Sequence, residues 1–312
     1  MGDICGRNDR RVSRRALIAL LALAATWGAS YLLISIALES FSPAFLTEVR
    51  FLLGALLVTA IAARRGDLRA LRGRWRAVAL LALVQQAAPM LLIAIGERSI
   101  SSGLAGTLVA STPLWAAVLA PALGGPRPAI LQWIGLTVGI AGVGLLLGAD
   151  TSGAALLGCA MVLLAGAGYA VGAAWTGRRF PELPRMALLS GVLLSSSALL
   201  VPPALVDLPA HTPSLASVLA VAGLGLAGTG AAFVVMYWLI GEVGPERTVL
   251  VTYLAPVFAV GYGASLRGEP FGVSAAVGLA LVLGGAYLAG RRTRLSTRPI
   301  AISDAAADPA AA

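Results

Sequence analysis

The tripeptide Ile95-Gly96-Glu97 begins a stretch that occurs twice in this chain, the second time from Ile240-Gly241-Glu242. A proline and two glycines follow each tripeptide, at Pro113, Gly135 and Gly142 in the first copy and at Pro256, Gly278 and Gly285 in the second. In both copies the proline and the first glycine are 22 positions apart, and the two glycines are 7 apart. This repeat indicates that one unit of about five apolar segments is written twice.

The composition is typical of an integral membrane protein. Hydrophobic residues make up 58% of the chain and charged residues only 12%, whereas a soluble domain has about 25% charged residues. The apolar residues form long runs separated by short charged loops. The 23 basic residues are all arginine and lie mostly in loops beside these runs, so nucleic-acid binding is not expected.

Ten apolar runs are long enough to cross a bilayer, which takes about 20 residues. The runs do not alternate polar and apolar residues as the strands of a membrane barrel do. We therefore expect an all-α integral membrane protein with ten transmembrane helices. The predicted spans are 16–38, 44–62, 77–95, 102–123, 130–148, 154–176, 186–206, 215–240, 247–266 and 271–290.

The placement of arginine predicts the topology. With the N-terminus inside, 20 arginines fall inside, Arg98 and Arg267 fall outside, and Arg50 lies within a span. The positive-inside rule then places both termini in the cytoplasm. Because each copy has five spans, an odd number, the second copy enters the membrane in the opposite sense. This predicts a 5+5 inverted-topology repeat of the kind found in secondary transporters.

The domain organisation follows from the same count. We expect a cytoplasmic basic N-tail over 1–15, five-helix repeats over 16–148 and 154–290, and a cytoplasmic disordered tail over 291–312. The arginine-rich start followed by an apolar run also resembles a cleaved signal peptide, but the run continues to about residue 38, which favours a first transmembrane helix.

A disulfide between Cys5 and Cys159 is not expected, and His211 has no nearby His or Cys for a metal site.

Two predicted spans carry a stripe of hydroxyl and aromatic side chains at helical spacing. The members are Trp27, Ser30, Tyr31 and Ser35 in the first span, and Thr107, Ser111 and Trp115 in the fourth. Such hydroxyls often bond within their own helix or to a neighbouring one, and aromatic side chains often fill the core. Two similar stripes nevertheless favour a single solvated cavity that both of them line.

Apart from Arg247, which stands at the membrane edge of the ninth span, Arg50 is the only arginine placed within a predicted span. An ionised side chain at the centre of a membrane helix costs about 2.5–3.5 kcal/mol or more. Two interpretations stay open: Arg50 extends to the outer interface because it lies near the start of its span, or it faces the cavity and binds an anion or acts in gating.

Further polar or helix-breaking residues lie in the third, fourth, eighth and ninth spans. Two adjacent amides, Gln85 and Gln86, cannot both face lipid cheaply, so at least one is expected to point inward, toward a substrate or a neighbouring helix. Pro113 and Pro256 each interrupt an apolar run, and either supplies polar backbone inside the membrane or only kinks its helix. Tyr237 and Thr252 add polar groups in the eighth and ninth spans.

Several function classes lack the residues they need. Apart from Glu48, no acidic residue lies well inside a predicted span, which argues against a proton pump that relays protons through carboxylates. No Walker A sequence, metal-ligand cluster or Ser–His pair occurs, so no cofactor is expected. Facilitated diffusion, or coupling through the charge of the substrate, remains open.

The chain resembles the EamA family of the drug/metabolite transporter superfamily over about residues 14–290. The motifs that carry the resemblance are Trp27-Gly28-Ala29-Ser30, Arg50-Phe51 after Pro43, Pro113, the glycine pairs of each half, and Gly268-Glu269. The chain departs from the family where Gly125-Pro126 replaces a Gly-Glu pair, at Tyr169, where a tryptophan often stands, and in span 7, where no arginine answers Arg50. These departures affect the symmetry of the motif residues rather than the fold.

The resemblance implies a multi-pass carrier of the bacterial inner membrane, often an exporter of amino acids or related small metabolites. It also implies a cavity formed by spans 1, 3, 4, 6, 8 and 9, with spans 5 and 10 at the periphery. The expected partners are a small-molecule substrate and the lipid bilayer, with a homodimer left open.

These observations predict a secondary transporter, not an enzyme, in which the two halves rock about a cavity at the middle of the membrane. The rival hypotheses are an intramembrane enzyme of lipid or glycan metabolism and a membrane sensor or assembly subunit that transports nothing. The residues predicted to line the substrate cavity are Trp27, Ser30, Tyr31, Gln85, Gln86, Thr107, Ser111, Tyr237 and Thr252, and those with gating or structural roles are Arg50, Pro113 and Pro256.

Overall fold

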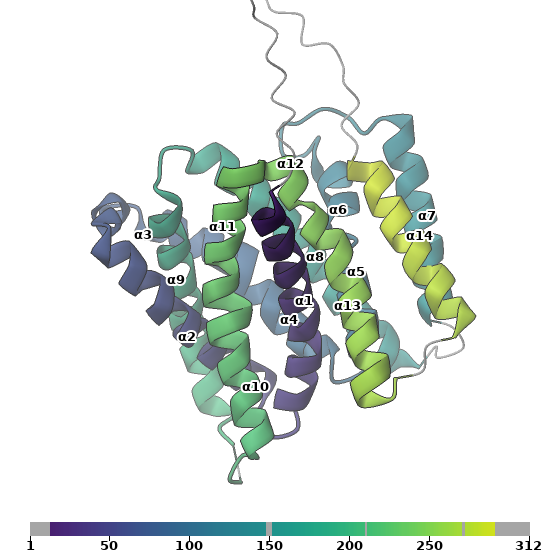
Figure 1. The fold of residues 1–312 in the computed structure, drawn as a ribbon, viewed down its shortest axis with the longest axis horizontal. Helices are drawn as coiled ribbons and strands as arrows, with labels where there is room; N and C mark the ends of the chain where they lie inside the picture. The colour runs from purple at the N-terminus through teal and green to yellow at the C-terminus, as the bar shows by residue number, and fades with distance from the viewer. Residues whose placement is uncertain (1–12, 148–151, 210, 270–271, 291–312) are drawn as a thin grey trace, which may run out of the picture.

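A computed structural model of the chain describes residues 13–147, 152–209, 211–269 and 272–290. These residues form a bundle of helices without strands (Figure 1). The predicted tails over 1–15 and 291–312 lie almost entirely outside the described residues. The two described ends of the chain, at α1 and α14, lie at the same end of the bundle (Figure 1). We call this the terminal end, and the opposite one the distal end.

Ten helical segments correspond to the ten predicted spans. By length and composition, eight of them could cross a membrane, α7 is a shorter apolar helix, and α13 completes the set. Three segments are made of more than one element. The segments are α1 (Arg14–Ala37), α2 (Pro43–Arg64), α3–η2–α4 (Trp75–Ala82, Leu83–Ala87, Ala88–Gly96), α5–α6 (Ser102–Val109, Thr112–Leu119), α7 (Ile130–Leu147), α8 (Gly153–Arg179), α9 (Arg185–Val206), α10–η3–α11 (Leu215–Gly225, Leu226–Ala231, Ala232–Val243), α13 (Leu250–Arg267) and α14 (Val273–Gly290).

Polar residues at the ends of the apolar runs determine where several helices begin. A serine side chain accepts a hydrogen bond from a backbone N–H of the first turn in five helices, and this satisfies a donor that the helix itself leaves unpaired. The capping residues are Ser13, Ser42, Ser101, Ser152 and Ser214. The short 3₁₀ helix η1 (Asp67–Leu71) and the four-residue α12 (Pro245–Thr248) lie in connections at the terminal end.

Spans 3 and 8 share an irregularity. Both η2 and η3 are π-helical turns inside otherwise α-helical segments. Gly96 and Gly241 are 145 positions apart, and at that offset residues 83–87 correspond to 228–232, which overlap η3. The two π-turns therefore occupy equivalent positions in the two halves. Such turns often mark functional sites, because they redirect side chains and free backbone groups.

Spans 4 and 9 differ, although each carries one of the paired prolines. The fourth span is broken at Ala110–Ser111, immediately before Pro113, into α5 and α6. The ninth span continues as one helix, α13, through Pro256. Of the two alternatives left open by the sequence, the break is seen beside Pro113, whereas the helix is continuous at Pro256. Neighbouring helix turns can adjust to compensate for the hydrogen bond that a proline removes, so the helix need not end there.

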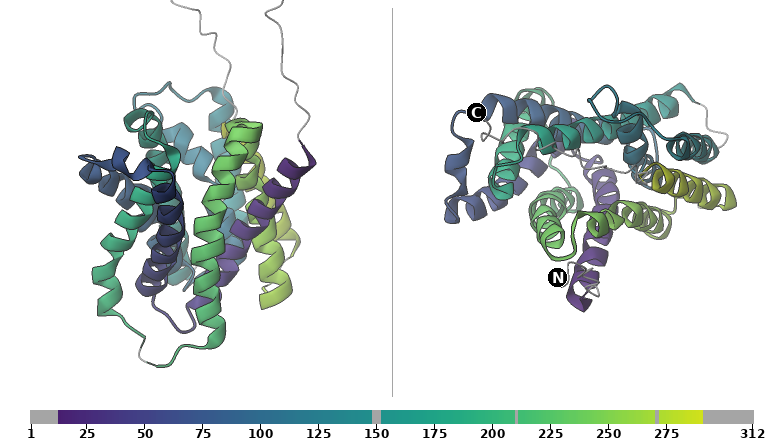
Figure 2. Two further views of the ribbon diagram at one scale, coloured as in Figure 1. Left: turned by 60° about the vertical axis from the view of Figure 1, so that its left-hand side comes forward. Right: turned by 90° about the horizontal axis from the view of Figure 1, so that it is seen from above.

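The repeated glycines hold α7 against α14 at the edge of the bundle (Figures 1 and 2). A side-chain carbon on Gly135 would lie 2.6 Å from the Gly285 carbonyl oxygen, and one on Gly142 would lie 2.8 Å from that of Gly278. The first glycine of each pair thus contacts the second glycine of the other pair. Reciprocal contacts of this kind are those of a two-fold axis, which supports the inverted repeat. These glycines therefore serve close helix packing.

The two ends of the bundle are packed differently. At the distal end one apolar cluster joins α1, α2, α4, α5, α8 and α10, and we call it the distal cluster. At the terminal end the apolar clusters are separate: one is formed by η1, α3, α9 and the end of α8, another by α1, α11 and α13, and a small one by α6 and α14. A further cluster joins α2, η2 and α9 and includes partly buried side chains of α11.

Candidate functional site

Arg50 is buried near the start of α2, with only 4% of its surface exposed. Its Nε donates a hydrogen bond of 2.8 Å to the hydroxyl of Thr229 in η3, and that hydroxyl donates to the Leu224 carbonyl at 2.9 Å. A buried guanidinium needs such partners because it loses the hydration it has in water. The interpretation in which Arg50 extends to the interface is therefore wrong, and its side chain lies inside the bundle.

Three further polar side chains lie within electrostatic range of Arg50: Tyr31 on α1, Glu97 at the end of α4, and Tyr169 on α8. The Tyr31 ring packs against Gly106 of α5, where a side-chain carbon would lie only 3.0 Å from a ring carbon. These residues join spans 1, 2, 3, 4, 6 and 8 around one region, which we call the central cluster (Arg50, Tyr31, Glu97, Tyr169 and Thr229).

Several buried oxygens have no hydrogen-bond partner among the described residues. In the central cluster they are Tyr169 Oη and both carboxylate oxygens of Glu97, and Gln86 Oε1 and Ser111 Oγ are two more. Gln86, Glu97 and Ser111 are each at most 8% exposed. A buried polar group without a partner costs about 1–3 kcal/mol, and native proteins keep few such groups. Two members of the central cluster with unpartnered oxygens therefore point to an additional ligand, water or proton there.

The two adjacent amides of the third span have different surroundings. Gln85 accepts a 3.2 Å hydrogen bond from the hydroxyl of Thr176 on α8, and its side chain packs against Gly172 of the same helix. Gln86 is buried, and its carbonyl oxygen has no partner. Within the π-turn, Gln85 thus connects two helices, whereas Gln86 has an acceptor available for a ligand.

The structure does not gather all the predicted cavity residues equally. Tyr31 belongs to the central cluster and Ser30 lies beside η3 at Gly228, whereas Trp27 makes an edge contact with Phe233 at a centroid distance of 5.9 Å. Thr107 is fully buried and bonds to the Gly103 carbonyl of its own helix. Tyr237 packs beside the cluster of α2 and α9.

Thr252 stands apart from the other predicted cavity residues. It is exposed, and its hydroxyl donates to the Val249 carbonyl of its own helix turn. Thr252 therefore makes a local hydrogen bond within its own helix turn and is not gathered with the other predicted cavity residues.

One expectation about charge needs correction. Few buried acidic residues were expected, but Glu97 is only 8% exposed, although it is just beyond the helical segment Trp75–Gly96. Glu48, the acidic residue noted within a predicted span, accepts a 2.9 Å hydrogen bond from Ser197 of α9. The sequence reasoning missed Glu97 because it counted residues inside predicted spans, not residues at span ends that fold inward.

The sequence reasoning also missed Thr229 and gave Tyr169 no site role. Thr229 lies in a Gly-Thr-Gly run that suggests close packing but not an arginine ligand. Tyr169 stood out only as a departure from a family pattern. The offset between the repeats is a signal that could have drawn attention to Thr229, because Thr229 lies in the π-turn equivalent to η2, which carries the two glutamines. This offset does not point to Tyr169.

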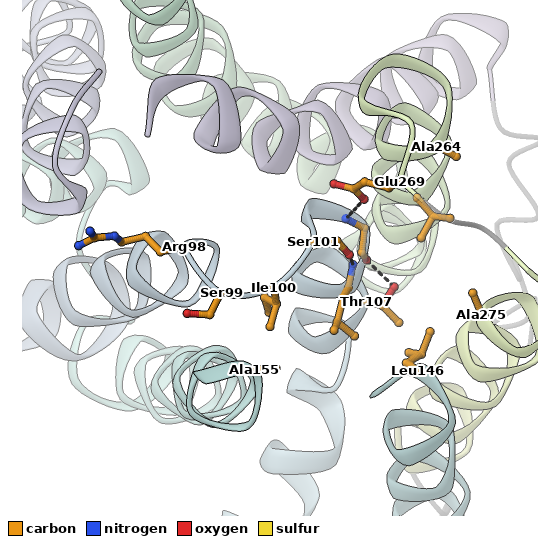
Figure 3. A pocket seen from close by; sticks show the side chains of 13 residues that line it. Arg98, Ser99, Ile100, Ser101, Thr107, Leu146, Ala155, Ala264, Glu269 and Ala275 are labelled. Carbon is orange, nitrogen blue, oxygen red and sulfur yellow. Dashed lines mark hydrogen bonds between the residues drawn. The ribbon is translucent and has the colours of Figure 1, made fainter. Parts of the chain in front are cut away.

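The distal end also holds a pocket of about 370 Å³ beside the loop that joins α4 to α5 (Figure 3). Glu269 lies in its wall and accepts three hydrogen bonds, from the backbone N–H of Ser102, the hydroxyl of Ser102 and the backbone N–H of Gly103. These groups stand at the first turn of α5, where the helix dipole favours a negative charge. Glu269 therefore fastens the end of α13 to the start of α5.

A second polar contact at the distal end joins α13 to α1. The Arg267 guanidinium donates to the Glu39 carboxylate at 2.7 Å and to the Ser35 hydroxyl at 3.2 Å. We call these two contacts, made by Glu269 and by Arg267, the distal latches. Among the described residues, no group of three or more His, Cys, Asp or Glu side chains could hold a metal ion.

Comparison with known proteins agrees with this architecture. A model of the EamA-like transporter family matches residues 14–148 and again 156–291, which together make up most of the chain. The chain belongs to the EamA-like transporter family. Its helices therefore span a membrane, and this EamA protein is a membrane transporter of the drug/metabolite transporter type.

Individual relatives support the same assignment. The chain is 31% identical to the uncharacterized inner membrane transporter YedA of Escherichia coli (strain K12), over 80% of this chain and 82% of that protein. It is 27% identical to the WAT1-related protein At3g02690, chloroplastic, of Arabidopsis thaliana, over 84% of this chain and 66% of the relative. A solved crystal structure matches with a TM-score of 0.65 and 25% identity, over 92% of this chain and all of its own.

Proposed function

We propose that this EamA protein exports amino acids or related small zwitterionic metabolites by alternating access. The observation that carries the proposal is the central cluster, in which a buried Arg50 lies within electrostatic range of Tyr169, whose hydroxyl oxygen has no partner. Gln86 and Ser111 each add a further buried oxygen without a partner. A guanidinium binds a carboxylate well, and neutral oxygens accept hydrogen bonds from an ammonium group. One region thus offers a complementary group to each end of an amino acid.

The packing of the two ends supports alternating access. The distal cluster and the distal latches join many helices of both halves, whereas the terminal end is divided into separate apolar clusters, of which the two larger ones are formed around α3 and α9 and around α1 and α11. We infer a conformation that is closed at the distal end, with the terminal end able to open between those clusters. Each terminal cluster combines helices from both sequence halves, so the rocking units would be α3, α9 and the end of α8 against α1, α11 and α13.

We propose that the terminal end faces the cytoplasm. Exposed arginines at this end, such as Arg72 and Arg74 on a connection and Arg178 in the last turn of α8, agree with the positive-inside rule. Single cysteines placed at Asp207 and Asp67, in a background without native cysteines, test this orientation. Only the cysteine at position 207, at the distal end, should react with a membrane-impermeant maleimide applied to intact cells, and the opposite pattern would invert the topology.

Proteoliposomes that contain the purified protein test the transport function. A panel of amino acids, amines and sugars is loaded, and efflux is compared with that from vesicles without protein. We expect amino acids to be moved. If no member of the panel moves, the carrier proposal fails and the enzyme and sensor hypotheses return.

The role of Arg50 is tested in the same vesicles. Arg50→Leu removes the buried charge and should lower amino-acid efflux about 100-fold, in line with the loss of a charged contact of about 3 kcal/mol. Arg50→Lys should restore part of it. Arg76→Leu is the matched control, because Arg76 is exposed at the start of α3 and should retain efflux. Efflux by Arg50→Leu at the normal rate would remove Arg50 from the site.

A further inference from the structure

Glu97 is a buried carboxyl group with no hydrogen-bond partner. It ends α4, where its backbone N–H donates to the Ile93 carbonyl, and its side chain turns into the bundle. Neither carboxylate oxygen receives a hydrogen bond from any described residue or is reached by solvent. A carboxylate left in this state would bear a large desolvation cost, and the usual response of such a group is to bind a proton.

The charged and titratable groups that face Glu97 come from three other elements. Arg50 on α2 and Tyr31 on α1 lie on the side of the central cluster, and Glu269 lies beyond α13 on the distal side. The oxygens of Glu269 already accept three hydrogen bonds from Ser102 and Gly103. Burial, together with the neighbouring charge of Glu269 and against the opposing effect of Arg50, raises the pKa of the Glu97 carboxyl.

The surroundings of Glu97 select a proton over larger cations. A metal ion or an ammonium group needs space and several oxygen ligands, but the Glu97 oxygens are enclosed, and the residues lining the distal pocket do not include Glu97. A proton needs no added space, because it only converts the carboxylate into a carboxylic acid. The wall of the distal pocket begins at Arg98, the next residue in the chain, which brings solvent on the distal side close to Glu97.

We propose that Glu97 binds the proton that drives transport, so that this EamA protein exchanges one proton for one substrate molecule. The inference rests on the proposed function and adds the coupling ion to it. The proton comes from water on the distal side, forms an O–H bond on the Glu97 carboxylate and removes the repulsion with Glu269. This favours the closed distal end, and the proton leaves to water on the terminal side before the substrate is carried outward.

The protonation state can be tested without any substrate. Difference infrared spectra of the purified protein, recorded during a pH titration, should contain the carbonyl band of a buried carboxylic acid. The band should be missing in Glu97→Gln and retained in Glu182→Gln, a matched change of an exposed carboxylate in the loop after α8. If the wild-type protein has no such band near neutral pH, the proposal is overturned.

Thermal stability gives a second test of the same group. A carboxyl with a raised pKa in the folded state binds more protons when folded than when unfolded, so stability is full at low pH and falls as pH rises from about 4.3 toward the raised pKa. The unfolding temperature of the wild type and of Glu182→Gln should fall over this window. The unfolding temperature of Glu97→Gln should change less over the same pH window. A fall as large as that of the wild type would contradict the proposal.

Vesicles test the coupling itself, with a mixture of the proteinogenic amino acids as substrate and a pH-sensitive dye enclosed. One pH unit should support up to about tenfold accumulation by exchange with protons, and the dye should report the counterflow of protons. Glu97→Gln should lose the dependence on the pH difference, whereas Glu182→Gln should keep it. Amino-acid movement by the wild type without proton counterflow overturns the inference, whereas a carboxyl band without any amino-acid movement overturns the proposed function instead.

Discussion

The distal and terminal ends of the bundle are made from the same helices and yet differ in how they are packed. At the distal end, side chains of six helices meet in one apolar cluster, and the distal latches join α13 to α1 and to α5. At the terminal end, the helices separate into clusters that share no members. One apolar cluster shared by six helices resists their separation, whereas separate clusters can move apart without exposing their own cores.

This difference has a cause in the repeat. The two-fold axis of an inverted repeat exchanges the two ends, so identical copies would produce identical ends. The copies differ most clearly in spans 4 and 9, because the first is broken before Pro113 and the second runs unbroken through Pro256. We infer that the opposite conformation exchanges these shapes: span 9 would break near Pro256, span 4 would straighten, and the terminal end would close.

The largest effect should come from fixing the distal end in its closed state. Cysteines replacing Glu39 and Arg267, in a background without native cysteines, stand where the two side chains now form an ion pair of 2.7 Å. A short bifunctional maleimide should join them and reduce amino-acid efflux from vesicles to the protein-free background. Each single-cysteine variant, treated in the same way, should retain its efflux.

The result that would contradict the comparison is efflux that continues after complete cross-linking. In that case the distal end would not need to open, and closure by the distal cluster would have no part in transport.

A smaller and oppositely signed pair of effects is expected from the two prolines. Pro113→Ala restores a backbone donor at the break and should favour the straight form of span 4, whereas Pro256→Ala should favour the unbroken form of α13. A proline costs about 3 kcal/mol inside a helix. Because the surrounding structure already compensates for part of this cost at both positions, each substitution should shift the equilibrium between the two conformations by about tenfold. The measurement is the rate at which a cysteine replacing Leu108, fully buried in the distal cluster, reacts with a reagent added from the distal side.

Labelling of this cysteine should become faster in Pro113→Ala and slower in Pro256→Ala. Equal changes in both variants would show that the prolines do not set the difference between the two ends.

The fold was predictable because its signals are periodic and local. Runs of about 20 apolar residues, loop arginines and the repeated Pro…Gly…Gly spacing are each readable without knowledge of contacts. Even the glycine contact between α7 and α14 could be anticipated, because glycines on a membrane helix serve close packing more often than chemistry. The outcomes at Pro113 and Pro256 could not be predicted, since the same residue in the same register has a different backbone in each copy.

The candidate site was only partly predictable, for a related reason. Tyr31, Gln86, Ser111 and Arg50 stand out in the sequence as polar residues in apolar runs. Glu97 does not, because a carboxylate at the end of a span reads as a solvated loop residue until the fold encloses it. The hydrogen bond from Arg50 to Thr229 joins residues 179 positions apart, and a single sequence contains no signal for such a pairing.

The smallest effect is expected for the α7–α14 pair, which should be packed equally well at both ends and so should not take part in the difference between them. Gly135 lies in the terminal half of α7 and Gly142 in its distal half, and both contact α14 with similar closeness. Gly135→Ala and Gly142→Ala should therefore lower the unfolding temperature by similar amounts, at a cost of about 1–3 kcal/mol each from overpacking. Gly144→Ala is the matched control, because nothing lies within 4 Å of the added carbon, and it should gain up to about 1 kcal/mol from helix propensity. All three variants should retain efflux, because α7 and α14 lie outside the central cluster.

The contradicting result would be a loss of efflux in only one of the two contact variants, Gly135→Ala or Gly142→Ala. The α7–α14 pair would then also differ between the two ends, and the difference would extend to the edge of the bundle.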